Sequence, residues 1–201
     1  MAQTASPALR RVRVVLWSLV VVAAVLATGL YLFRPPSGPL AVTGEPFALA
    51  STAGGTFTEQ NLRGTPTLVF FGYTFCPDVC PTTLAESTAW RKELGLTPEQ
   101  LRIVFVTVDP ARDTLPVVTD YLGGFDPSII GLVGDETQTE AAKKSFGASS
   151  EKVAGNDPNF YLVNHTATLF LIDKDGRFQG TVAYGENRDA AISKIKRLVG
   201  A

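Results

Sequence analysis

The chain has very few side chains that bind soft metals or exchange electrons. Its 201 residues include two cysteines, one histidine and one methionine, the last being the initiator Met1. Two cysteines are too few for a disulfide-rich scaffold, and the absence of a second cysteine pair argues against a structural zinc knuckle. Any site that binds a metal through sulfur and imidazole must therefore use nearly all of these residues.

The chain also lacks an excess of charge of either sign. It has 18 Lys and Arg against 19 Asp and Glu, which gives a net charge of −1. Proteins that bind nucleic acid neutralise phosphates with a basic excess, so we expect no nucleic-acid partner. Hydrophobic residues make up 45% of the sequence, an ordinary globular share, and the length predicts about one domain.

One segment lacks charge altogether. Residues 14–33 contain no charged side chain and follow three arginines between residues 10 and 13. About 20 apolar residues are enough to cross a bilayer as a helix. We therefore expect a cytoplasmic tail at 1–11 and a transmembrane anchor at 12–33. A cleavable signal peptide is the alternative, but its apolar region usually runs about 7–15 residues, and a clear small-x-small cleavage site is missing.

The positions of the arginines predict the orientation of this anchor. Three precede its uncharged stretch and Arg34 alone follows it, so the positive-inside rule places the N-terminus in the cytoplasm. Because a long Arg- and Ser-rich mitochondrial transit segment is absent, we expect a bacterial inner membrane, crossed once, with the rest of the chain on the extracytoplasmic side. The Pro- and Gly-rich residues 34–40 predict a short, stiff linker, and residues 41–201 a folded domain.

Apolar runs and amphipathic segments alternate through this domain. We expect a hairpin of two short strands at 47–49 and 55–58, followed by strands at 66–74, 101–110 and 129–135 and by one strand on either side of a turn at 173–176. We expect helices at 81–94, 114–125, 136–146 and 186–199. This order predicts the α/β class, with a mixed sheet flanked by helices and an N-terminal β-hairpin. Both cysteines lie at the first strand–helix junction after the hairpin, which resembles a thioredoxin-like architecture.

The two cysteines, Cys76 and Cys80, are each followed by proline. A residue before proline is pushed out of the α region, so we expect both to be non-helical, with Pro81 opening a helix and Cys80 as its N-cap. A helix N-terminus lowers the pKa of a nearby thiol and favours the reactive thiolate. A purely structural disulfide is the alternative, although closing so short a loop would stabilise the fold weakly.

His165 stands where a later strand is expected to begin. In α/β sheets the strand ends gather at one functional edge, which can bring this imidazole to the cysteines. Two thiolates and one imidazole suit copper or zinc. Their softness favours Cu(I), whereas zinc would normally require a fourth ligand. A hydrogen-bonded structural histidine is the alternative reading.

Three stretches, taken together and in order, resemble the Sco/SenC family: GYTFCPDVCPTTL at 72–84, VTVDPARDT at 106–114 and VNHTATLFLIDKDG at 163–176. This family comprises membrane-anchored, thioredoxin-like copper proteins that assist the assembly of cytochrome c oxidase. The resemblance implies that the metal ligands are Cys76, Cys80 and His165. It also implies one copper per chain, as Cu(I) or Cu(II).

Three further positions near these motifs bear on the site. Many family members have Asp where this chain has Asn164, a change that removes a charge but no ligand. Asp78 is a possible weak oxygen ligand for Cu(II), but we interpret it as a solvated loop carboxylate. In the DPARDT motif at 109–114 we expect Asp113 or Thr114 to cap the next helix and Arg112 to pair with an acidic neighbour, since hard carboxylates suit copper poorly beside thiolates.

The leading functional hypothesis is a metallochaperone that delivers copper to the oxidase subunit carrying the binuclear copper site, and that receives it from an upstream copper donor. The alternative is an enzyme, a thiol–disulfide oxidoreductase that reduces the copper-ligand cysteines of the oxidase, with Cys76 attacking and Cys80 resolving. A peroxiredoxin-like peroxidase is a weaker third reading, because only Thr74 fits the Thr and Arg that such enzymes place around their cysteine. His165 separates the first two hypotheses, since dithiol exchange needs only the sulfurs.

Overall fold

The protein is described from a computed structural model, which defines residues 7–32, 41–154 and 160–200. The chain divides into two units, residues 1–37 and 38–201. Most of the predicted cytoplasmic tail and the whole predicted linker at 34–40 lie outside the described residues. The boundaries expected for these two segments therefore stay predictions.

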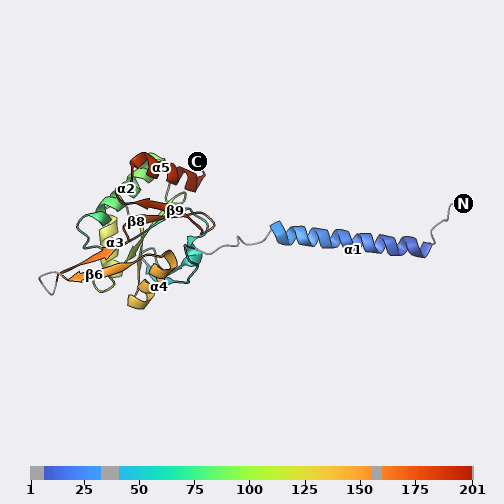
Figure 1. Cartoon of the computed structure of the whole chain (residues 1–201), viewed down its shortest axis with the longest axis horizontal. Helices are drawn as coiled ribbons and strands as arrows, with labels where there is room; N and C mark the ends of the chain where they lie inside the picture. The colour runs from blue at the N-terminus through green and yellow to red at the C-terminus, as the bar shows by residue number, and fades with distance from the viewer. Residues whose placement is uncertain (1–6, 33–40, 155–159, 201) are drawn as a thin grey trace. The chain divides into compact units, whose positions relative to one another are not determined.

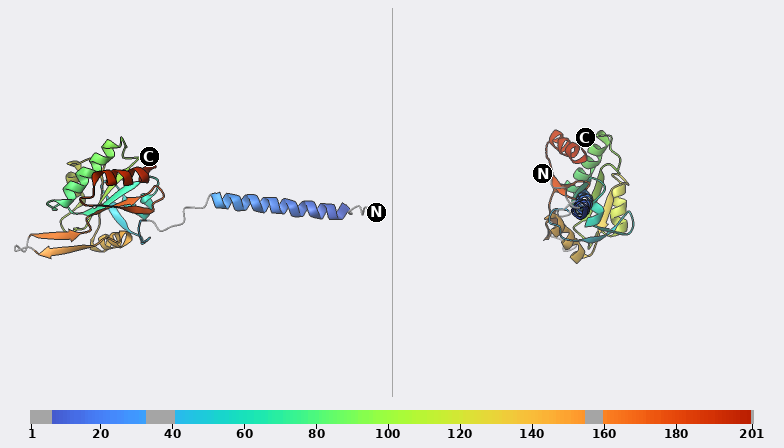
Figure 2. Two further views of the ribbon diagram at one scale, coloured as in Figure 1. Left: turned by 45° about the horizontal axis from the view of Figure 1, so that its top comes forward. Right: turned by 90° about the vertical axis from the view of Figure 1, so that its right-hand side faces the viewer.

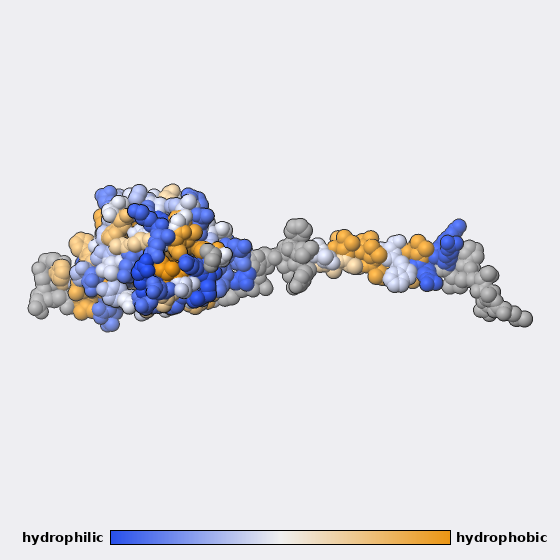
Figure 3. Space-filling model, turned by 90° about the horizontal axis from the view of Figure 1, so that it is seen from above, coloured by the Kyte–Doolittle hydropathy of each residue, from blue (hydrophilic) through white to orange (hydrophobic). Residues whose placement is uncertain are grey.

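The first unit contains a single described helix, α1 (Pro7–Leu32). Its residues 10–29 contain an 18-residue window with a mean hydropathy of 2.2, and within the described parts of the chain it is the one helix long and apolar enough to cross a membrane. Hydrophobic residues cover most of its length (Figure 3). This length and composition agree with the expected anchor, and a signal sequence would share them.

The second unit is built on a seven-stranded mixed sheet with the order β2-β1-β5-β4-β3-β8-β9. β3 pairs in parallel with β4, and β4 with β5, while the remaining pairs are antiparallel. The predicted mixed sheet and N-terminal hairpin are confirmed. The strands are β1 (Ala48–Ser51), β2 (Thr56–Thr58), β3 (Thr67–Gly72), β4 (Arg102–Thr107), β5 (Ile130–Val133), β8 (Thr168–Ile172) and β9 (Phe178–Ala183).

Helices cover both faces of this sheet. α2 and α5 lie together on one side, and α4 lies on the opposite side (Figures 1 and 2). α3 packs against β5, where Val118 and Leu122 approach Gly131. The central strand β3 is buried along its whole length, as expected for a strand covered on both faces. The helices are α2 (Val79–Glu93), α3 (Leu115–Gly123), α4 (Glu136–Phe146) and α5 (Arg188–Val199), with a short 3₁₀ turn, η1, at Glu59–Leu62.

A second sheet of two strands lies beside the main one and was not expected from the sequence. β6 (Ser150–Ala154) and β7 (Tyr161–His165) pair antiparallel, with Ser150 opposite His165. They form a ribbon at the side of the domain (Figure 1). His165 therefore ends β7 and does not begin the next strand, which starts at Thr168. The expectation failed because β7 is short and only alternately buried, so its apolar signal is weak.

Candidate metal centre

The two cysteines lie on either side of the start of α2. The helix begins at Val79 with Asp78 as its N-cap, so Cys76 belongs to the preceding turn and Cys80 to the first helical turn. The expectation that Cys76 is non-helical is confirmed, and the expectation that Cys80 is a non-helical N-cap is wrong. Pro81 occupies the third helical position, where an N–H would have no intrahelical acceptor, so the helix can begin before it.

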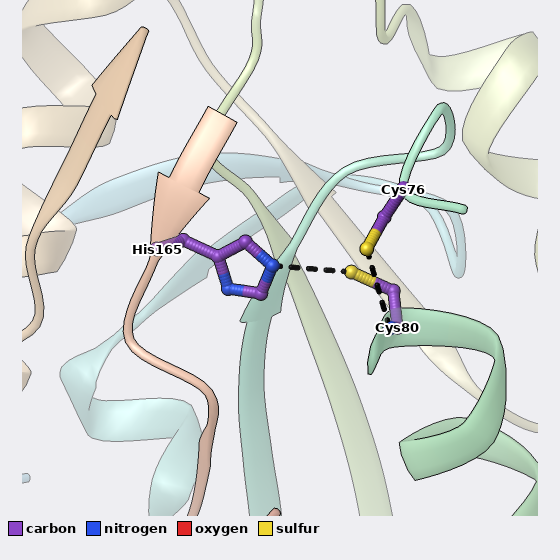
Figure 4. A group of neighbouring side chains, drawn as sticks. All are labelled: Cys76, Cys80 and His165. Carbon is purple, nitrogen blue, oxygen red and sulfur yellow. Dashed lines mark hydrogen bonds between the residues drawn. The ribbon is translucent and has the colours of Figure 1, made fainter. Parts of the chain in front are cut away.

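Neither cysteine is in a disulfide, and their surroundings differ. Cys80 is fully buried, whereas Cys76 is half-buried and faces the rim of the site. The backbone N–H of Cys80 donates to Cys76 Sγ at 3.4 Å (Figure 4). Through this bond the N-terminus of α2 stabilises negative charge on the Cys76 sulfur, as the sequence predicted.

The hydrogen bonds between the two cysteines separate their pKa values. Hydrogen bonding from the Cys80 side chain, helped by backbone N–H groups, lowers the pKa of Cys76 to about 4 in spite of partial burial. The same side-chain hydrogen bond, together with burial, raises the pKa of Cys80. At neutral pH Cys76 is therefore the thiolate and Cys80 the thiol of the metal-free protein.

His165 reaches the cysteines from the ribbon. Its Nε2 lies 3.4 Å from Cys80 Sγ, and its Nδ1 lies 3.3 Å from the carbonyl oxygen of Thr166 (Figure 4). Since a carbonyl only accepts, Nδ1 carries the proton and Nε2 presents its lone pair to the sulfurs. The rings of Phe70 and Tyr73 hold the imidazole edge-to-face, each with its centroid 5.8 Å away.

The structure thus brings the three expected site residues together. The sulfur of Cys76, the sulfur of Cys80 and a ring nitrogen of His165 all lie within 4.8 Å of one another, although the histidine is 85 positions from Cys80 in the sequence. Two thiolates and an imidazole form a soft donor set that fits copper. This cluster is able to bind one copper ion.

Asp78 lies outside this cluster. Its side chain is exposed and accepts a hydrogen bond from the hydroxyl of Tyr184 at 3.3 Å. This position agrees with its interpretation as a loop carboxylate.

The hydroxyl of Thr74 already has a hydrogen-bond partner, because it donates to Asp113 Oδ1 at 2.6 Å. That bond directs the hydroxyl proton to Asp113 and not to Cys76.

Asp113 has a different role from the one expected. It is fully buried and accepts hydrogen bonds from Thr74 N–H at 3.1 Å and from the Thr107 hydroxyl at 2.6 Å, in addition to the Thr74 hydroxyl. Its carboxylate braces the cysteine loop against β4 and does not cap α3. Thr114 takes the N-cap position of α3, but its side chain makes no capping bond. Burial raises the pKa of Asp113, against the effect of these hydrogen bonds.

Two contributors to the site were missed by the sequence reasoning. A Cβ on Gly72 would lie 2.8 Å from Cys80 Sγ, so this glycine makes room for the buried sulfur. A glycine at the end of a buried strand, four residues before Cys76, was a usable signal. Tyr161 contacts Arg112 and Asp109 from β7. The sequence gives no local signal for Tyr161, because its partners are about 50 residues away.

Comparison with known proteins agrees with this geometry. The SCO1/SenC family model matches residues 36–200. The mitochondrial protein SCO2 of Saccharomyces cerevisiae is 35% identical over 161 residues, which are 79% of this chain and 53% of that protein, so the chain spans about half of this longer relative. The SCO2-like protein of Rickettsia felis is also 35% identical, over 80% of this chain and 85% of its own length.

Solved structures show the same fold with metal bound. ScoI of Bradyrhizobium japonicum with copper bound is 38% identical, with a TM-score of 0.69, and the match covers 76% of this chain and 97% of that one. Yeast Sco1 with copper bound is 32% identical, with a TM-score of 0.70 over 82% of this chain and 90% of the other. The sequence motifs, the thioredoxin-like fold and the Cys-Cys-His cluster therefore have one explanation, which is that this chain belongs to the SCO1/SenC family.

Proposed function

We propose that this protein binds one copper ion through Cys76, Cys80 and His165 and delivers it to the binuclear copper site of a cytochrome c oxidase subunit during assembly. The observation that carries the proposal is the convergence of both cysteines and the only histidine of the sequence within 4.8 Å. Two relatives hold copper in their solved structures. BsSco, whose solved structure has the same fold, is a member of the Sco family of cytochrome c oxidase assembly proteins.

The state of the ligands suits uptake of the ion. Metal binding requires deprotonated thiols, and the low pKa of Cys76 supplies one thiolate before copper arrives. The raised pKa of Cys80 means that its proton leaves to solvent as copper binds. The contact between Nδ1 and the Thr166 carbonyl orients the imidazole so that Nε2 faces the sulfurs.

The exposure of the ligands also suits release. Cys80 is enclosed in the core, while Cys76 is half-buried beside the exposed side chain of Phe75. An incoming thiolate from a partner can therefore approach the copper from the Cys76 side first. The order of ligand exchange would begin at Cys76 and end at the enclosed Cys80.

The same cysteines support a second candidate, a thiol–disulfide oxidoreductase that reduces the copper-ligand cysteines of the oxidase. The specific observation is an accessible thiolate at Cys76 backed by a buried thiol at Cys80. The Cys76 thiolate would attack a partner disulfide and form a mixed disulfide. Cys80, after losing its proton, would then attack Cys76 Sγ and release the reduced partner, so that the two electrons come from this dithiol.

His165→Ala in the full chain separates the two candidates. We expect dithiol exchange to persist, Cu(I) to remain on two thiolates and Cu(II) retention to fall, because the nitrogen ligand is lost. The measurements are copper per chain, the thiolate-to-copper absorption of the Cu(II) form and the oxidase level in cells. Loss of oxidase with intact dithiol exchange supports copper delivery. A normal oxidase level with lost copper would refute it and favour the reductase.

A further inference from the structure

The strand that carries His165 is held outside the main sheet. β7 is hydrogen-bonded to β6 in a separate two-stranded sheet, whereas the cysteines lie at the junction of β3 and α2. Main-sheet hydrogen bonds constrain His165 from its C-terminal side only, because β8 begins three residues later and pairs with β3. On the N-terminal side, the approach of β7 to the cysteine loop depends on side chains that connect the ribbon to the rest of the domain.

Arg112 makes the most extensive of these connections. One guanidinium nitrogen donates to the carbonyl oxygen of Tyr161 at 3.1 Å, and the guanidinium carbon lies 3.7 Å from the centre of the Tyr161 ring. A second nitrogen is paired with Asp109, which is fully buried and accepts from the Tyr161 hydroxyl at 2.7 Å. The arginine and its carboxylate thus hold both the backbone and the side chain of one β7 residue.

The same guanidinium also contacts the cysteine loop. It lies 4.8 Å from the ring centre of Phe75, the residue before Cys76, and 5.7 Å from that of Tyr73. The hydroxyl of Tyr73 in turn accepts from Val163 N–H at 3.2 Å, two residues before the histidine. Arg112 is therefore placed between the loop that carries the sulfurs and the strand that carries the imidazole.

We propose that Arg112 is a positioning residue of the metal centre, which holds the ribbon bearing His165 at a fixed distance from the cysteine loop. The proposal deepens and rests on the proposed copper function. A planar guanidinium can pair with Asp109, donate to a carbonyl and stack on an aromatic ring at the same time. A lysine ammonium cannot make these three contacts from one position. Arg112→Lys therefore keeps the charge but removes the link between the ribbon and the cysteine loop.

The first test compares full-length wild type, Arg112→Lys and the matched control Arg102→Lys in detergent. Arg102 also bridges two segments, by donating to the carbonyl oxygen of Asn61, but it lies at the other end of β4. We expect Arg112→Lys to release Cu(II) to a chelator about 10–100-fold faster and to lose the nitrogen hyperfine coupling of the imidazole in EPR spectra. It should still bind one Cu(I) per chain on the two thiolates, and the control should match wild type.

A milder variant and a measurement on the metal-free protein extend the test. Tyr161→Phe removes only the hydroxyl bond to Asp109, and its Cu(II) release should fall between wild type and Arg112→Lys. In the metal-free protein, the amide of Val163 should exchange with solvent faster in Arg112→Lys, while the amide of Thr74, held by Asp113, should not change.

The outcomes distinguish this proposal from the function on which it rests. Arg112→Lys with wild-type Cu(II) release, wild-type nitrogen coupling and unchanged Val163 exchange would overturn the positioning role. A lower melting temperature with a normal Cu(II) spectrum in the folded fraction would overturn it too, since it would show a structural role alone. If wild type itself bound no copper, the proposed function would fail, and amide exchange would still decide whether Arg112 holds the ribbon.

Discussion

Replacing Gly72 with alanine should disturb the buried sulfur of Cys80 directly. The new Cβ would lie 2.8 Å from Cys80 Sγ, 2.8 Å from a ring carbon of Phe105 and 2.9 Å from one of Phe70, while ordinary contact begins at 3.4 Å. The sulfur and the Phe105 ring must therefore each retreat by about 0.6 Å, and both side chains are fully buried. Phe70 also supports the imidazole of His165, so a shift of its ring reaches the third ligand.

The size of the effect follows from two opposing contributions. Overpacking a well-filled core costs about 1–3 kcal/mol, and alanine recovers about 0.4–1 kcal/mol by restricting the unfolded chain. We expect a net destabilisation of about 1–2 kcal/mol, which lowers the melting temperature by about 2–8 °C for a protein of this size. The copper affinity should fall as well, because Cys80 Sγ is displaced from the position that faces His165.

The assay is thermal unfolding of the full chain followed by circular dichroism, with a copper titration of the reduced protein. Gly123→Ala is the matched control, since Gly123 ends α3 and a Cβ there would meet nothing within 4 Å. The control should be neutral or slightly stabilising. A Gly72→Ala protein that melts at or above the wild-type temperature and binds copper normally would refute the reasoning about this close approach.

Three further predictions concern the cysteines and the anchor. The oxidised protein, with a Cys76–Cys80 disulfide, should bind no copper at this site until it is reduced, and equal loading of both forms would show that the sulfurs are not ligands. Because the pKa of Cys76 is lowered to about 4, its alkylation rate in the metal-free protein should be flat between pH 6 and 9 and should fall only as the pH approaches about 4. A rate that rises through about pH 8.5, the region of an unperturbed thiol, would contradict that shift. A reporter fused after Ala201 should be active only outside the cytoplasm, and a mature protein that begins after residue 30 and is free of membranes would contradict the anchor.

The parts of the fold that local sequence determines were predictable. The helix expected at 136–146 has those bounds in the structure, because Asp135 caps its start and Gly147, at a φ of 65°, ends it. The three candidate ligands, which the structure brings together, could also be picked out from the sequence, because rarity left few other candidates. Both results depend on signals that are contained within a few residues or in the composition.

The parts that depend on distant partners were not predictable. Asp113 or Thr114 was expected to cap the nearest helix, and Thr114 takes that position, yet the main partner of Asp113, Thr74, is 39 positions away. The ribbon was missed because its strands pair only with each other and its position is set by Arg112 and Tyr73, which lie 49 and 90 positions from their partners. A local pattern carries no information about which distant side chain will satisfy a buried polar group.

The separation of the ligands along the chain has a consequence for the lifetime of the protein. Copper held by Cys80 and His165 would act as a removable cross-link across 85 positions, and a link of that span restricts the unfolded chain strongly. By mass action, free copper at a hundred times its dissociation constant would add about 2.7 kcal/mol to the free energy of unfolding. Handing over the ion would remove that contribution at once. A protease that cleaves only unfolded chains would then degrade the copper-free protein faster than the copper-bound protein. The rate of degradation would therefore indicate whether the copper had been transferred.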